Sequence, residues 1–262
     1  MNIDEQIKKN RYYMQCPSFD TVMRESDQKK GLLRPEQGKD CGGQKIVLPA
    51  FDAAIKNGSY TDLLTTRRSI REYCPEKPMS QEQLAFLLWS INSVQQHRDP
   101  AKVHTLRPVP SGGARHPFEV YFVAKNIEGL EQGLYHYMPM ENIGEKLVTI
   151  ERLGDFDKQD YNAKITEMLS GQDWAVDAAM VAFISCIPYR GEWRYMDLAH
   201  RVMLTDLGFL SQNFMLSCAA MNLGSCCMAG YRQGLCDEVF GHDGLNEYTV
   251  MAIAAGVPKE EE

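Results

Sequence analysis

From Ile46 onward, short apolar runs alternate with polar segments, and the spacing of the apolar residues predicts helices and strands. Ser80-Gln-Glu-Gln83 has the form of a capping box and precedes leucines at helical spacing, so we expect a helix to begin there. Runs that are rich in β-branched and aromatic residues predict strands. These runs lie at 118–124, 133–137, 147–150, 178–187, 225–228 and 248–256. The run at 178–187 is apolar throughout, which is typical of a central strand buried on both faces.

Four further segments favour helices, at 60–66, 157–169, 195–222 and 233–240. The segment 195–222 contains no proline and is apolar over most of its circumference, and Gly224 is the expected stop signal. A helix this apolar needs cover on all sides. In a domain of this size, part of that cover is expected from a second subunit. The order of elements predicts an α+β fold.

Residues 1–45 are polar and show no periodicity, so they are expected to form a partly ordered arm, which could be loose or embrace a partner subunit. Residues 46–262 show no repeat, low-complexity tract or linker, and we expect a single domain there.

Composition and charge argue against several classes of function. The 28 basic and 35 acidic residues leave a net charge of −7, so no global basic field is available for nucleic acid or an anionic membrane. No signal peptide or membrane-spanning run is recognisable, which makes the cytoplasm the expected location. The eight cysteines include no Cys-x-x-Cys pair, and we expect reduced, buried thiols and no metal site.

Arg67-Arg-Ser-Ile-Arg71 is the first segment with chemical potential. It offers three guanidiniums and a hydroxyl within five residues, and guanidiniums bind phosphate in a planar, bidentate geometry. The alternative, a solvated basic turn, has about even odds on this motif alone.

Two glycine-containing segments follow. Pro110-Ser-Gly-Gly-Ala-Arg-His-Pro117 allows the backbone to approach a flat or phosphorylated ligand, but a plain connecting loop would look the same. Asn222-Leu-Gly-Ser-Cys-Cys-Met-Ala-Gly-Tyr231 has small residues against which a planar group could lie; the alternative is a helix stop and a tight turn.

Taken in order, these segments resemble the FMN-dependent nitroreductase superfamily, and within it the branch of the azoline dehydrogenases. The similarity extends from about Ile46 to Pro258 and includes Phe118-Glu-Val-Tyr121, Gly133-Leu-Tyr-His-Tyr137 and Gly256-Val-Pro258. The resemblance implies a mixed sheet flanked by helices. It also implies a homodimer formed through long central helices, with two FMN sites shared between the subunits.

The resemblance also implies roles for individual residues. Arg67, Ser69 and Arg71 match the clamp on the phosphate and ribityl chain, and Arg68 lies beside the polar edge of the ring. Pro110, Ser111, Gly112 and Gly113 match the loop that covers the partner's flavin. Ala229 and Gly230 match the turn whose N–H points at flavin N5. Gln172 matches the amide at the ring, and Lys259 matches the basic tail at the phosphate. The family's tail usually continues with further basic residues, whereas Lys259 is followed by three glutamates.

The implied reaction is a two-step transfer of hydride, from NAD(P)H to flavin N5 and on to a nitroaromatic, quinone or enone. No protein nucleophile is required, and none is predicted; His116 and His136 are the nearest candidate acids, although structural roles are expected for both.

One alternative is azoline oxidation, but those enzymes carry a Lys-Tyr pair where this chain has Ile187-Pro-Tyr-Arg-Gly191. The other is a non-catalytic module that binds or senses flavin.

Overall fold

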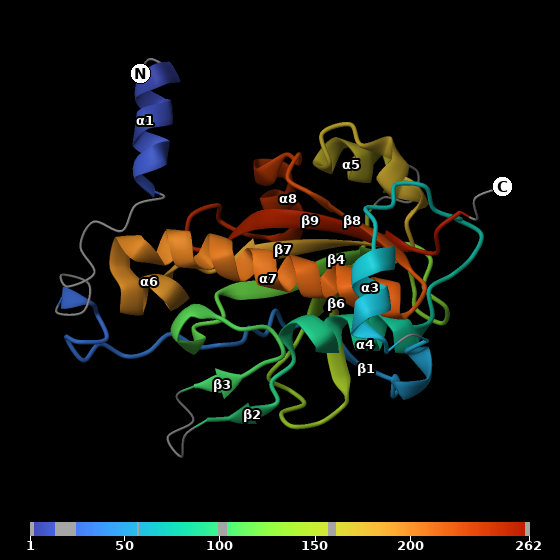
Figure 1. Ribbon diagram of the computed structural model, residues 1–262, viewed down its shortest axis with the longest axis horizontal. Coiled ribbons are helices and arrows are strands. Elements are labelled where there is room, and N and C mark those ends of the chain that lie inside the picture. The colour runs from blue at the N-terminus through green and yellow to red at the C-terminus, as the bar shows by residue number, and fades with distance from the viewer. Residues whose placement is uncertain (1–2, 14–24, 57, 99–103, 157–160, 260–262) are drawn as a thin grey trace.

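The computed structural model describes residues 3–13, 25–56, 58–98, 104–156 and 161–259, and a seven-stranded sheet lies at its centre (Figure 1). The strand order is β1-β6-β5-β4-β7-β9-β8, and each strand is antiparallel to its neighbours. A parallel bridge between Ser69 and Ser225 continues the sheet beyond β8 and makes it mixed. The strands are β1 Gln44–Leu48, β4 Phe118–Ala124, β5 Gly133–Tyr137, β6 Val148–Gly154, β7 Met180–Cys186, β8 Gly224–Met228 and β9 Tyr248–Gly256, with a separate hairpin of β2 Gln96–His97 and β3 Thr105–Leu106.

Helices cover both faces of the sheet (Figure 1). On one face, α4 and α7 pack onto a core that includes Phe122 and Ile184. On the other face, α5 and α8 pack onto a second core that includes Tyr121 and Phe183. The helices are α1 Ile3–Tyr13, α3 Tyr60–Thr66, α4 Gln81–Asn92, α5 Tyr161–Met168, α6 Tyr189–Tyr195, α7 Ala199–Ala220 and α8 Gln233–Phe240. The predicted α+β class is therefore confirmed.

Most predicted elements are present where the apolar pattern placed them. The capping box at the start of α4 is complete, because the Gln83 N–H donates to Ser80 Oγ (3.2 Å) and the Ser80 N–H donates to Gln83 Oε1 (2.8 Å). Every residue of β7 is buried, as expected of a central strand. Strand β6 extends four residues beyond the predicted end at 150. The predicted helix at 157–169 is observed from Tyr161, and residues 157–160 lie outside the described part of the chain.

The predicted helix at 195–222 is wrong at both ends. The chain turns at Met196, which has a φ of 51°, so α6 and α7 are separate helices joined by a 3₁₀ turn, η4 Met196–Leu198. Gly191 of α6 lies directly against α7, where a Cβ would be 3.4 Å from Met203 Sδ. At the other end Asn222, with a φ of 57°, ends the helical region, and Gly224 begins β8. Asparagine tolerates this conformation better than most residues, so it replaces the expected glycine stop.

The polar arm contains more structure than its sequence indicated. Helix α1 has no apolar stripe, but Asp4 and Glu5 in its first turn and Arg11 in its last complement the helix dipole. The predicted boundary between residues 45 and 46 lies inside β1, which pairs with β6. Gln37 is buried, and its side chain donates to the carbonyl oxygen of Ala114 (2.6 Å). Residues 25–43 therefore pack onto the domain.

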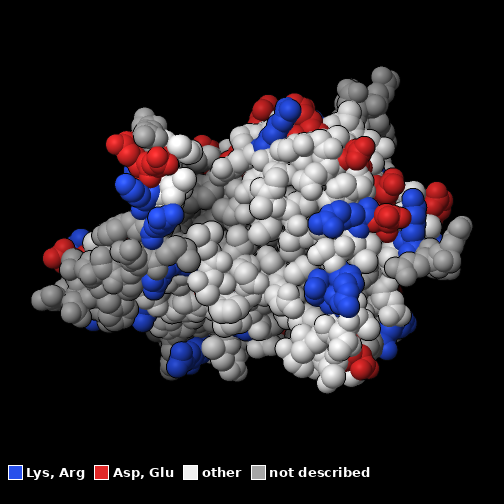
Figure 2. Space-filling view, turned by 45° about the horizontal axis from the view of Figure 1, so that its top comes forward, with Lys and Arg blue, Asp and Glu red and all other residues white. Residues whose placement is uncertain are grey.

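Charged side chains of both signs are interspersed on the face shown in Figure 2, and neither sign forms a continuous field there. Among the described residues, no helix combines the length and apolar character that crossing a bilayer requires.

Candidate functional site

The arginine-rich segment Arg67–Arg71 follows α3 and lies along the outer edge of β8. Its backbone is fixed there by the Ser69–Ser225 bridge and by a hydrogen bond from the Ile70 N–H to the carbonyl oxygen of Ser225 (3.0 Å). A Cβ on Gly224 would lie 2.8 Å from Ile70 Cβ, so this close approach requires glycine.

The side chains of this segment are available to a ligand. Arg68, Ser69 and Arg71 are exposed and Arg67 is half-buried. Arg68 donates to the carbonyl oxygen of Arg67 (2.9 Å), and the Arg71 guanidinium lies 5.9 Å from the centre of the Trp174 ring. Within the described ranges, no carboxylate lies at ion-pair distance from any of the three guanidiniums. Among the described residues these three cations have no counter-ion, which favours the approach of an anion to this segment of a chain of negative net charge.

Gln172, Ala229, Gly230 and Lys259 are located in the same region. Ala229 and Gly230 are exposed immediately after β8. Gln172 Nε2 donates to the carbonyl oxygen of Gly230 (2.6 Å), so this amide holds the turn. The Lys259 N–H donates to the carbonyl oxygen of Glu72 (3.1 Å), which brings the C-terminal segment beside the arginine-rich one. We call these four residues together with Arg67–Arg71 the arginine half-site.

The loop Pro110–Gly113 is held against the first half of α7. Ser111 Oγ donates to Asp206 Oδ2 (2.6 Å), and the Gly112 N–H donates to both oxygens of the same carboxylate (3.0 and 3.1 Å). A Cβ on Gly112 would lie 2.2 Å from Val202 Cγ1. Burial raises the pKa of the Asp206 carboxyl, although both hydrogen-bond partners oppose this. Asp206 was not among the residues expected from the sequence, in which the available signal is a single acid within an apolar helix.

The loop and the backbone of Arg67–Arg71 are held near opposite ends of α7. The loop contacts Val202 and Asp206, whereas the arginine segment contacts Gly224 and Ser225, beyond the end of the helix at Ala220. At 1.5 Å per residue, the helix alone separates them by about 20 Å. Within one chain the backbone of Pro110, Ser111, Gly112 and Gly113 therefore lies away from the backbone of Arg67–Arg71.

Both histidines considered as acids are internal. His116 is buried, and its Nε2 lies 3.2 Å from the carbonyl oxygen of Thr105; burial and Arg107 lower its pKa to about 2, so it is neutral. His136 is fully buried between Glu119 and Glu151. Burial raises the pKa of Glu119, but Arg190 and His136 outweigh burial and hold it at about 2. These contacts support structural roles for both histidines.

A cavity of about 450 Å³ opens beside the Pro110–Gly113 loop. Three arginines line it, namely Arg98, Arg107 and Arg194, together with His104 and His116. No acidic residue is found among the described residues that line it. Arg107 is bonded internally, to Asn92 Oδ1 (2.6 Å) and the carbonyl oxygen of Gln37 (2.7 Å). Arg98 and Arg194 are therefore the arginines that can meet an anionic group in this cavity.

Comparison with protein-family models gives a match to the nitroreductase family over residues 64–257. A protein of Methanocaldococcus jannaschii that is named as a nitroreductase is 25% identical over 195 residues, covering 74% of this chain and 89% of its own length. The microcin B17-processing protein of Escherichia coli is 27% identical over 193 residues, which is 71% of this chain and 65% of that protein. This chain thus spans less than two thirds of the microcin-processing protein.

Solved structures share the fold. A nitroreductase structure from Anabaena variabilis has a TM-score of 0.63 at 22% identity, covering 83% of this chain and 42% of that one. The E. coli microcin synthetase complex has a TM-score of 0.60 at 21% identity, covering 79% and 75%. A structure from Exiguobacterium sibiricum solved with FMN has a TM-score of 0.54 at 13% identity, covering 78% and 90%.

Proposed function

Because the chain belongs to the nitroreductase family and is by class an oxidoreductase, we propose that it binds one FMN per subunit at the arginine half-site. The observation that carries this proposal is the group of Arg67, Arg68 and Arg71, which lie together without a carboxylate partner among the described residues. Guanidiniums suit a terminal phosphate because they donate in pairs. The chain also has no Gly-x-Gly-x-x-Gly fingerprint after a strand, so an adenine dinucleotide is disfavoured.

Each residue of the half-site has a proposed task. Arg67, Ser69 and Arg71 hold the phosphate and ribityl chain, and Arg68 provides positive charge at the polar edge of the ring. Ala229 and Gly230 present backbone to the ring, and Gln172 fixes that turn through its hydrogen bond to Gly230. Lys259, whose backbone is tied to Glu72, adds charge near the phosphate.

We propose further that the site is completed by a second copy of the chain. Two α7 helices packed antiparallel about a twofold axis would carry the Pro110–Gly113 loop of one subunit to the arginine half-site of the other. Large apolar side chains on the open face of α7 support this arrangement: Leu204 is 67% exposed and Phe209 is 46% exposed. Asp206 sets the position of the loop through Ser111 and Gly112.

When bound, FMN supplies the redox chemistry, accepting hydride from NAD(P)H and passing it to a small organic acceptor such as a nitroaromatic, quinone or enone. The protein's residues bind and orient the reactants, supply charge and exclude water.

The proposal is tested by the absorption spectrum and FMN content of the purified protein, followed by anaerobic titration with NADH and NADPH. We expect one releasable FMN per chain and bleaching of the flavin band by one of the two nucleotides. Finding FAD, or no flavin after FMN is added, would contradict the cofactor assignment. Bound FMN that neither nucleotide reduces would favour a non-catalytic flavin module.

The cavity with Arg98 and Arg194 predicts a preference for anionic acceptors. Para-nitrobenzoate and para-nitrobenzamide differ mainly in charge, and a partly exposed ion pair contributes about 0.5–1 kcal/mol. We therefore expect the KM of the benzoate to be about 2- to 5-fold lower than that of the amide. The preference should disappear in Arg194→Gln while the KM of the amide stays unchanged. Equal KM values in the wild type, or the same preference in the variant, would refute this role of the cavity.

A second candidate function is oxidation of an azoline ring in a peptide. The observation in its favour is the similarity to the microcin B17-processing protein and, at 30% identity over 125 residues, to the trifolitoxin-processing protein of Rhizobium leguminosarum. The residue before Tyr189 is Pro188 where a Lys-Tyr pair would have lysine, and the residue after it, Arg190, is buried and paired with Glu119 (2.5 Å). A thiazoline peptide that bleaches the flavin band under anaerobic conditions, where NADH and NADPH do not, would favour this function.

A further inference from the structure

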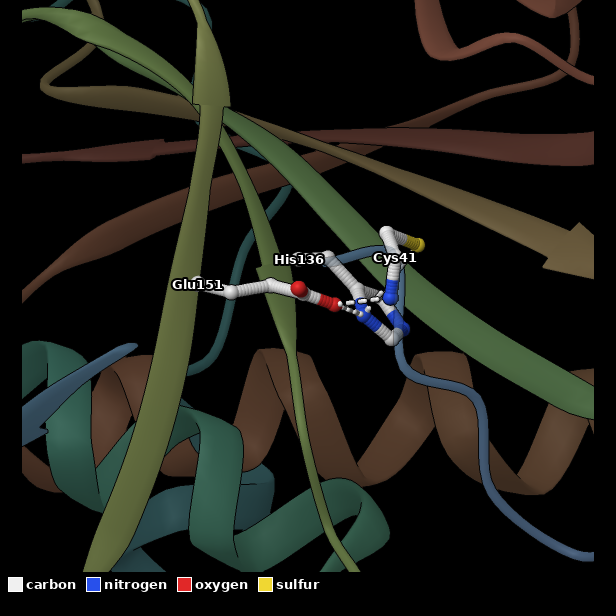
Figure 3. Close-up of side chains that lie close together, drawn as sticks. All are labelled: Cys41, His136 and Glu151. Carbon is white, nitrogen blue, oxygen red and sulfur yellow. Dashed lines mark hydrogen bonds and ion pairs between the residues drawn. The ribbon is translucent and has the colours of Figure 1, made fainter. Parts of the chain in front are cut away.

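Cys41, His136 and Glu151 lie close together (Figure 3). Three strands separate β5 from β8, which borders the arginine half-site. His136 lies on β5 and Glu151 on the neighbouring β6, directly opposite each other in the strand pairing. Cys41 belongs to the segment that leads into β1. The thiol sulfur, one ring nitrogen and a carboxylate oxygen all lie within 4.8 Å of one another.

The three side chains are held in place by the surrounding backbone. The Cys41 N–H donates to Glu151 Oε1 (2.8 Å) and the Gly43 N–H donates to Oε2 (2.8 Å), which fixes both the carboxylate and the approach of the thiol. His136 Nδ1 lies 2.8 Å from Glu151 Oε1 and 3.8 Å from Cys41 Sγ. His136 and Glu151 are fully buried, whereas Cys41 is exposed, so a small ion can enter from the Cys41 side.

The other ring nitrogen of His136, Nε2, also has a partner. His136 Nε2 lies 3.3 Å from Glu119 Oε2, and the other oxygen of Glu119 accepts from Arg190 Nη2 (2.5 Å). A carboxylate behind a ligating imidazole orients the ring and strengthens its bond to a metal, and such partners accompany histidine ligands in most metal sites.

We propose that Cys41 Sγ, His136 Nδ1 and Glu151 Oε1 form a binding site for a zinc-like divalent transition metal. Thiolate, imidazole and carboxylate are the ligands that zinc takes in proteins, and three such ligands leave a fourth position for water on the exposed side. In a tetrahedral zinc site, ligand atoms about 2.0–2.3 Å from the metal are roughly 3.4–3.6 Å apart. The nitrogen and oxygen need to separate by about half an ångström to reach this geometry. The sulfur lies 3.8 Å from Nδ1 and within 4.8 Å of the carboxylate oxygen, so the Cys41 side chain has to turn toward both (Figure 3).

The buried charge stays balanced when the metal binds. Arg190 offsets Glu119, which leaves the Glu151 carboxylate to be balanced. A divalent cation bound to the Cys41 thiolate carries one net positive charge, which offsets the same carboxylate. The site spans the arm, β5 and β6, so the metal acts as a clip between residues 25–43 and the sheet. Sequence spacing does not indicate it, because the ligands lie at positions 41, 136 and 151 without a short motif.

Cobalt(II) and zinc(II) titrations of the FMN-loaded protein test the proposal. The wild type should bind one zinc per chain, and cobalt should give a near-ultraviolet thiolate-to-metal charge-transfer band. Both should be lost in Cys41→Ala and kept in the matched control Cys74→Ala, which removes a half-buried thiol elsewhere. Cys41→Ala keeps the backbone hydrogen bond to Glu151 and loses, besides the thiol ligand, a contact of 3.7 Å with the Tyr121 hydroxyl.

Two independent readouts accompany the titration. Zinc should raise the Tm of the wild type and of Cys74→Ala but not that of Cys41→Ala. FMN content should be the same in all three proteins, so failure of the metal proposal is separable from failure of the flavin proposal. Absence of the cobalt band in the wild type, or equal zinc uptake by Cys41→Ala, would overturn the metal site.

Discussion

Leu204→Glu is expected to convert a dimer into a monomer and to weaken FMN binding by at least about 100-fold, since the penalty for burying an unpaired charge is several kcal/mol. Leu204 lies on the open face of α7, with 67% of its surface exposed in the single chain. A twofold axis places the substitution twice in one interface. The isolated subunit should still fold, because the new carboxylate faces solvent there.

Sedimentation velocity at several protein concentrations and fluorescence titration with FMN measure the two effects. The matched control is Leu245→Glu, in which a leucine that is 75% exposed in the loop after α8 receives the same charge. That variant should behave as the wild type in both measurements. A Leu204→Glu protein that remains dimeric would exclude this face of α7 as the interface. A monomer that binds FMN as tightly as the wild type would refute the shared site, and with it the proposed contacts of Pro110, Ser111, Gly112 and Gly113.

Arg71→Ala is expected to lower FMN affinity by about 1.5–3 kcal/mol, the contribution of a charge-assisted hydrogen bond, or roughly 10- to 150-fold in Kd. The side chain is exposed and its guanidinium lies over Trp174, so its removal leaves no cavity and should change the free energy of unfolding little. The fall in affinity can therefore be assigned to the lost contact with phosphate.

Fluorescence titration with FMN again provides the measurement, and riboflavin, which has no phosphate, serves as the second ligand. The loss should be confined to FMN if Arg71 meets the phosphate. Arg11→Ala is the matched control, because this arginine is exposed on α1. An unchanged FMN dissociation constant in Arg71→Ala would mean that the segment is a solvated turn. An equal loss of affinity for riboflavin would mean that Arg71 contacts the ring and not the phosphate.

Local sequence determined most of the secondary structure, because a helix or strand that is buried on one or both faces shows a regular pattern of apolar residues. The alternation and apolar runs located β4, β5, β7 and β9, and the Ser80–Gln83 box located the start of α4. The same reasoning failed where no such pattern exists. Helix α1 is polar along most of its length, with charges that complement its dipole and a hydrogen bond from Gln6 to Asn10 (2.7 Å). The break between α6 and α7 falls at Met196, a residue type that gives no warning of a positive φ.

The arrangement of the site was decided by tertiary structure. The arginine segment and the Pro110–Gly113 loop can each be predicted from sequence, but the positions of their backbones near opposite ends of α7 follow from how the helix packs on the sheet. The Cys41–His136–Glu151 group likewise depends on the register of β5 with β6 and on the path of the arm. The physical reason is common to both. The hydrophobic pattern around a residue indicates whether that residue is buried. The residues that it contacts are determined by packing between segments far apart in the chain, and local spacing does not indicate them.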